Sequence, residues 1–138
     1  MIAYVDSSVL CRVVMRQPNR LEELETCSQR LTSLLTQVEC LRAIDKARLD
    51  EGLDEDEILA RRLVLFEQLR RMSRTAVSRS VLDRAGSSFP LPVKALDAIH
   101  LATALQLRER RYHELVFATH DRQQGRAALA QDFEVIGL

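Results

Sequence analysis

The sequence predicts an α/β fold with three layers, α/β/α, in which the central layer is a mostly parallel sheet of about five short strands. Short apolar runs bounded by turn residues recur along the chain, as is typical of strands buried in a parallel sheet. Segments with apolar residues at helical spacing alternate with these runs. The 138 residues contain no internal repeat, low-complexity tract or linker, so we expect one domain spanning residues 1–138.

The first half of the chain begins with a strand. Met1–Val5 is apolar, and Asp6-Ser7-Ser8 caps a helix that must end before Gln17-Pro18-Asn19. A short helix is predicted over 20–27 and a strand over 30–32, with Ser33 as a cap. The next helix extends to about Leu49, and its predicted buried positions are Leu34, Val38, Leu41 and Ile44.

The second half continues the alternation after an acidic turn at 50–57. The helix after this turn is predicted to bury a stripe formed by Leu59, Leu63, Phe66 and Leu69. The remaining elements are expected as a strand at 73–77, a helical turn at 81–85, a loop at 87–92, a helix to about 110, a strand at 115–118, a helix to 130 and a strand at 133–137.

Composition narrows the class of protein. Apolar residues make up 46% and charged residues 29%, which is ordinary for a globular domain, and no segment is long and apolar enough for a membrane span. The formal net charge of zero argues against binding nucleic acid by bulk attraction alone. Cys11, Cys27 and Cys40 lack metal-type spacing and are interpreted as reduced thiols of a cytosolic protein, although a single disulfide stays open.

One acid stands in an unusual place. The segment 96–105 is apolar on nearly every side of a helical wheel, yet it contains Asp97 close to its start, just downstream of Pro92. The positive end of the helix dipole reduces the cost of this carboxylate but does not explain it. A buried carboxylate needs a partner, and a metal ion is an effective one.

Three further acids are expected at the same place. Asp6 follows the first strand, Asp121 follows the 115–118 strand, and Glu39 lies nearly two turns into the helix after the second strand. Ligand sites in open parallel sheets gather at the carboxyl ends of the strands. Clustered carboxylates favour hard cations such as Mg²⁺ or Mn²⁺, whose bound water can attack a phosphodiester.

Each acid also has a simpler interpretation. Asp6 and Asp121 could simply cap the helices that they precede. Asp97 could simply complement the dipole of its helix. Glu39 could form an ion pair with Arg42 or Lys46 on its own helix. These alternatives stay open from the sequence alone.

The neighbouring polar residues are equally ambiguous. His100 and His120 are interpreted as packed, hydrogen-bonded residues rather than ligands. Thr119 could orient a water or an acid, or merely end its strand. The arginine pairs 61–62, 70–71 and 110–111 are more simply solvated helix faces than nucleic-acid contacts.

Four stretches carry a family likeness. They are Tyr4–Leu10, Thr36–Ala43, Leu96–Ala104 and Ala118–Asp121. In the order and spacing of these stretches, the chain resembles the PIN-domain nucleases. In its size and in the residues of the motifs, it resembles the VapC-type toxins of bacterial toxin–antitoxin pairs. Each motif is weak by itself, but the four together span the whole chain.

The resemblance implies an RNA-cleaving enzyme. Asp6, Glu39, Asp97 and Asp121 would be the catalytic acids that bind Mg²⁺ or Mn²⁺, and Thr119 occupies a position where the family often has Thr or Ser. The implied partners are an RNA substrate and a small cognate antitoxin that blocks the cleft, often on a toxin homodimer. No family acid is missing.

Two other functions are compatible with the predicted fold. A catalytically silent PIN-fold module that binds RNA or protein is the main alternative, and the complete set of acids argues against it. A phosphoacceptor domain would need an acidic neighbour of Asp6 and a lysine on a late strand, and the sequence has neither. A nucleotide-binding fold with a Gly-rich loop is also unsupported, because the four glycines are scattered and form no phosphate-binding loop.

Overall fold

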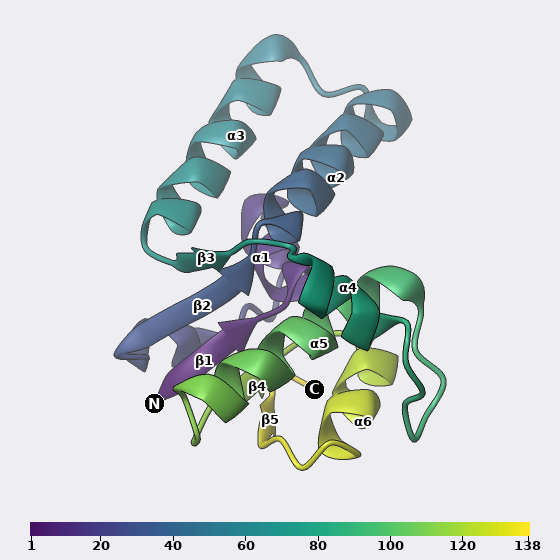
Figure 1. Ribbon diagram of the computed structural model, residues 1–138. Coiled ribbons are helices and arrows are strands. Elements are labelled where there is room, and N and C mark those ends of the chain that lie inside the picture. The colour runs from purple at the N-terminus through teal and green to yellow at the C-terminus, as the bar shows by residue number, and fades with distance from the viewer.

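The computed structural model describes all 138 residues and contains a single five-stranded sheet (Figure 1). The strand order is β3-β2-β1-β4-β5, and every pair of neighbours is parallel. This confirms the predicted parallel sheet and its five short strands. The strands are β1 (Ile2–Val5), β2 (Gln29–Ser33), β3 (Ser73–Thr75), β4 (Val116–Ala118) and β5 (Val135–Ile136).

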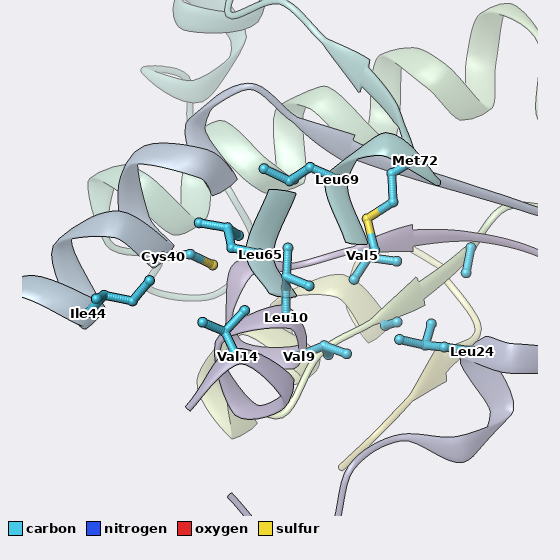
Figure 2. Packing of buried hydrophobic residues seen from close by; sticks show 12 residues of the cluster. Val5, Val9, Leu10, Val14, Leu24, Cys40, Ile44, Leu65, Leu69 and Met72 are labelled. Atoms are coloured by element: carbon cyan, nitrogen blue, oxygen red, sulfur yellow. The ribbon is translucent and has the colours of Figure 1, made fainter. Parts of the chain in front are cut away.

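Helices cover both faces of the sheet and complete the three layers. The helices are α1 (Ser7–Val14), α2 (Leu35–Glu51), α3 (Glu55–Arg70), α4 (Arg79–Ala85), α5 (Ala95–Arg110) and α6 (Arg122–Leu129), with a short 3₁₀ helix, η1 (Glu22–Thr26). Side chains of α1, α2 and α3 pack with Ala3 and Val5 of β1 (Figure 2). Tyr4 points to the opposite face, where α5 and α6 pack. This alternation is the period of two that a strand imposes.

The predicted buried faces of α2 and α3 are partly wrong. Val38, Leu59 and Leu63 are 55%, 55% and 62% exposed, and Leu34 is also exposed. The buried residues are Thr36, Cys40, Ile44 and Ala47 on α2, and Leu65 and Leu69 on α3. The two helices are present as predicted, but the side of each that is buried depends on its neighbours. These neighbours are α1 and the other member of the antiparallel α2–α3 pair, which extends beyond the sheet (Figure 1).

Other boundaries differ by a few residues. Helix α2 continues to Glu51 and α3 begins at Glu55, so the expected turn at 50–57 is reduced to residues 52–54. Gly52 ends α2 with a left-handed φ of 66°, and Asp54 caps α3 by accepting a hydrogen bond from the Glu57 amide. Helix α5 begins at Ala95, so Pro92 lies outside its first turn. No helix combines the length and apolar character that a bilayer crossing requires.

Candidate active site

The four predicted acids lie at the carboxyl-end edge of the sheet. Asp6 directly follows β1, Asp121 lies just beyond β4, Asp97 is in the first turn of α5, and Glu39 is in the second turn of α2. The charges of Asp6, Asp121 and Glu39 all act on Asp97 and raise its pKa, in addition to the larger effect of its burial. Carboxylates from distant parts of the chain therefore share one electrostatic environment.

Asp6 uses one oxygen to build the structure and leaves the other free. Its Oδ2 accepts hydrogen bonds from the Ser8 hydroxyl (2.6 Å) and the Thr119 hydroxyl (2.9 Å), and the Ser8 amide makes Asp6 the cap of α1. Its Oδ1 is buried and has no hydrogen-bond partner. A buried, unpartnered carboxylate oxygen is costly unless a donor or cation joins it. Asp6 therefore caps α1 through Oδ2, and its Oδ1 remains available to a ligand.

Glu39 faces the acids rather than the basic residues of its own helix. Its Oε2 accepts a hydrogen bond from the Ser7 hydroxyl (3.1 Å), and its Oε1 lies 2.5 Å from His100 Nε2. The simpler interpretation of Glu39 as a pair with Arg42 or Lys46 is wrong. Arg42 pairs with Asp45, and Lys46 pairs with Asp50.

His100 links Glu39 to the core. The ring is fully buried, and its Nδ1 lies 2.8 Å from the Tyr4 hydroxyl, which is buried too. Burial raises the pKa of Tyr4, so the phenol stays protonated and can donate to a neutral ring. Nε2 then carries the proton that Glu39 accepts, and it also carries one when the ring is charged. Tyr4 and His100 therefore fix the orientation of the Glu39 carboxylate.

The charge on His100 depends on opposing effects. Burial alone would lower its pKa, but the hydrogen bond with Glu39 and the charges of Asp6, Glu39 and Asp97 raise the pKa above its usual value. His100 Nε2 is also 3.7 Å from Asp6 Oδ1. The prediction of a packed, hydrogen-bonded histidine is confirmed, and its direct contact with Glu39 was missed. The only sequence signal was its position one turn after Asp97.

Thr119 and Asp121 organise the end of β4. The Thr119 hydroxyl donates to Asp6 and accepts from the Asp121 amide (3.0 Å), so this side chain orients an acid. Asp121 caps α6 by accepting a hydrogen bond from the Gln124 amide (2.9 Å). The capping interpretation of Asp121 is therefore correct. Its side chain is exposed at the rim, where it can also contribute to a site.

The donor set fits a hard divalent cation that keeps part of its water shell. All four candidate ligands offer carboxylate oxygens, and the free Oδ1 of Asp6 supplies one buried position. No three acidic, imidazole or thiol side chains are arranged as a ready-made cation cage. Such an incomplete shell fits Mg²⁺ or Mn²⁺, which bind through one or two carboxylates and complete their coordination with waters and substrate phosphates.

The raised pKa of Asp97 would make cation binding at this edge of the sheet sensitive to pH. Burial, followed by the charges of Asp6 and Asp121, raises the pKa of Asp97 to about 6. Below that pH the carboxyl is protonated and neutral, so a cation must displace the proton. We expect Mn²⁺ affinity, measured by calorimetry, to be nearly constant above pH 7 and to fall about tenfold per unit below pH 6. Equal affinities at pH 7 and pH 5 would contradict a ligand role for Asp97.

Two cavities of the molecule lie away from the four acids. A cavity of 1140 Å³ is lined by residues of α1, η1 and the end of α3, and it contains none of the four acids.

The arginine pairs lie on solvated helix faces, as predicted. Arg71 pairs with Glu67, Arg62 lies over the Phe66 ring, and Arg111 lies over the Tyr112 ring.

Comparison with known families matches residues 3–129 to the PIN domain. The chain belongs to the PIN domain family. Among curated proteins, this PIN domain is 36% identical to Ribonuclease VapC46 of Mycobacterium tuberculosis, over 75% of each chain.

Solved structures show the same fold. A toxin–antitoxin complex from Klebsiella pneumoniae matches with a TM-score of 0.65 and 20% identity, covering 97% of this PIN domain and 95% of that chain. VapBC2 from Rickettsia felis, bound to a promoter DNA fragment, matches with a TM-score of 0.64 and 14% identity, covering 99% and 98%. At these identities the likeness concerns the fold.

Proposed function

We propose that this PIN domain is a metal-dependent endoribonuclease that acts in the cytoplasm as the toxin of a toxin–antitoxin pair. The observation that carries the proposal is the group of four carboxylates at one sheet edge, with a buried oxygen of Asp6 left unpartnered. The relative at 36% identity is named a ribonuclease, which supports RNA as the substrate.

The catalytic acids are Asp6, Glu39, Asp97 and Asp121. Asp6 Oδ1 and Asp97 would hold a Mg²⁺ or Mn²⁺ ion, while Glu39 and Asp121 would bind its waters or a second ion. When bound, the cation supplies a water activated for attack on the phosphodiester and neutralises the charge that develops on the phosphate. Ser8 and Thr119 hold Asp6 in place, and His100 holds Glu39.

The basic residues are nearly all arginine, since Lys46 and Lys94 are the only lysines, and surface arginines would bind the RNA backbone. Arginine donates paired hydrogen bonds to phosphate, and such contacts position a nucleic acid without reading its sequence. The neutral net charge indicates that these contacts are local rather than a field of the whole protein.

A small antitoxin protein is the proposed partner, on a toxin homodimer. One structural neighbour is a toxin–antitoxin complex, which supports a protein partner for this chain. The α2–α3 pair adds a physical argument because four of its apolar side chains are more than half exposed. They are Val38, Leu49, Leu59 and Leu63.

Metal-dependent cleavage of RNA tests the proposal. Purified protein incubated with single-stranded and hairpin RNA is expected to cut internally with Mg²⁺ or Mn²⁺, and EDTA is expected to stop the reaction until excess metal restores it. Ca²⁺ serves as a control cation, because its larger coordination shell fits this site poorly. Absence of both cleavage and millimolar Mn²⁺ binding would favour the alternative, a silent PIN-fold binding module.

A further inference from the structure

Two of the three cysteines lie in contact inside the α1–α2 interface. Cys11 is on α1 and Cys40 is on α2, and their Sγ atoms are 3.1 Å apart. Both belong to the core region between the sheet and these helices, where Figure 2 labels Cys40. Cys27 is separate from this pair, and its thiol donates to the Glu23 carbonyl oxygen. All three are free thiols.

We propose that Cys11 and Cys40 form an oxidation site that takes a hydroperoxide as its substrate and closes to a disulfide joining α1 to α2. A disulfide has a sulfur–sulfur distance of about 2.05 Å, so the two sulfurs need to approach by only about 1 Å. They sit on neighbouring packed helices, and no other residue separates them. Most thiol pairs in a folded domain are too far apart to close without moving the backbone.

The two thiols differ in access, and this difference sets their order of reaction. Cys11 is partly exposed, whereas Cys40 is fully buried. A hydroperoxide from solvent therefore reaches Cys11 first. The two Sγ atoms lie within hydrogen-bond distance of each other, and this contact lowers the pKa of Cys11.

The reaction balances with hydrogen peroxide as the oxidant. The Cys11 sulfur attacks one peroxide oxygen, the O–O bond breaks, and the departing hydroxide takes the thiol proton to form water. The resulting Cys11 sulfenic acid is attacked by the Cys40 sulfur, the S–O bond breaks, and the second hydroxide leaves as water with the Cys40 proton. Two thiols lose two electrons in total, and one peroxide is reduced to two waters.

The disulfide would constrain the unfolded chain. It closes a loop whose ends are 29 residues apart and which contains η1 and β2. Restricting the unfolded ensemble raises the folding stability. We expect the melting temperature of the full chain to rise by roughly 5–10 °C after oxidation and to return after treatment with a thiol reductant.

The experiment treats the full wild-type chain with hydrogen peroxide in slight excess and needs no metal or RNA. The expected result is a loss of two hydrogen atoms by intact mass, a fall from three titratable thiols to one, and a linked peptide pair containing Cys11 and Cys40. The Cys27→Ser variant serves as the matched control and is expected to form the same link. Cys11→Ser and Cys40→Ser are each expected to lose it.

Three results would overturn the proposal. They are a link that includes Cys27, a link between two chains, and oxidation of Cys11 to sulfinic acid with Cys40 left as a free thiol. Because the measurements concern mass, thiols and melting temperature, they stand whether or not the protein cleaves RNA.

Discussion

The Asp97→Asn variant is expected to lose RNA cleavage by at least about 100-fold while keeping its fold. Asparagine matches the shape of aspartate but has no charge, so it is a much weaker ligand for Mg²⁺ or Mn²⁺. It also removes a half-buried negative charge that is repelled by Asp6 and Asp121. The melting temperature is therefore expected to stay the same or rise. Initial rates of cleavage at saturating Mn²⁺, with a thermal melt of the same sample, provide the measurement.

The matched control for this variant is Asp56→Asn. Asp56 also lies in the first turn of a helix, α3, but it is exposed and lies outside the acidic edge of the sheet. We expect this control to cleave RNA at the wild-type rate. If Asp97→Asn cleaves as fast as the control, Asp97 is not a metal ligand and the proposed mechanism fails.

The His100→Leu variant is expected to weaken Mn²⁺ binding by about 10- to 100-fold. Leucine fills the core position with an apolar side chain but removes the Nε2 proton that Glu39 accepts. Groups that orient metal ligands through hydrogen bonds typically contribute effects of this size. Calorimetric titration with Mn²⁺ measures the change independently of cleavage.

Two further variants separate positioning of Glu39 from packing. His100→Gln retains an N–H donor and is expected to recover part of the lost affinity. Tyr4→Phe keeps the ring stacked on Phe117 but releases His100 Nδ1, so a smaller loss is expected. If the leucine and glutamine variants bind Mn²⁺ equally, or both match the wild type, His100 does not position Glu39.

The sequence was sufficient to predict the framework and to predict that the four acids lie at one edge of the sheet. Buried strands such as β1 and β4 are short apolar runs, and the parallel arrangement follows from their alternation with helices. Once that sheet is assumed, Asp6 and Asp121 must lie at one edge because both follow strands. Asp97 was visible because a charged residue in an apolar helix requires an explanation.

Two aspects could not be obtained from local patterns. The exposed faces of α2 and α3 depend on which neighbours cover these helices, and Val38 and Leu63 have the same helical spacing as truly buried residues. The contact between Tyr4, His100 and Glu39 joins residues up to 96 positions apart. Hydrogen-bond networks of this kind are set by tertiary packing, so no spacing rule identifies them.

Anomalous diffraction from crystals grown with Mn²⁺ locates the cation directly. The proposed site predicts a Mn²⁺ peak at the carboxyl-end edge of the sheet, with Asp6 Oδ1 and a carboxylate oxygen of Asp97 among its ligands. A fully bound Mn²⁺ ion elsewhere on the molecule, with Asp6 Oδ1 still unpartnered, would contradict it.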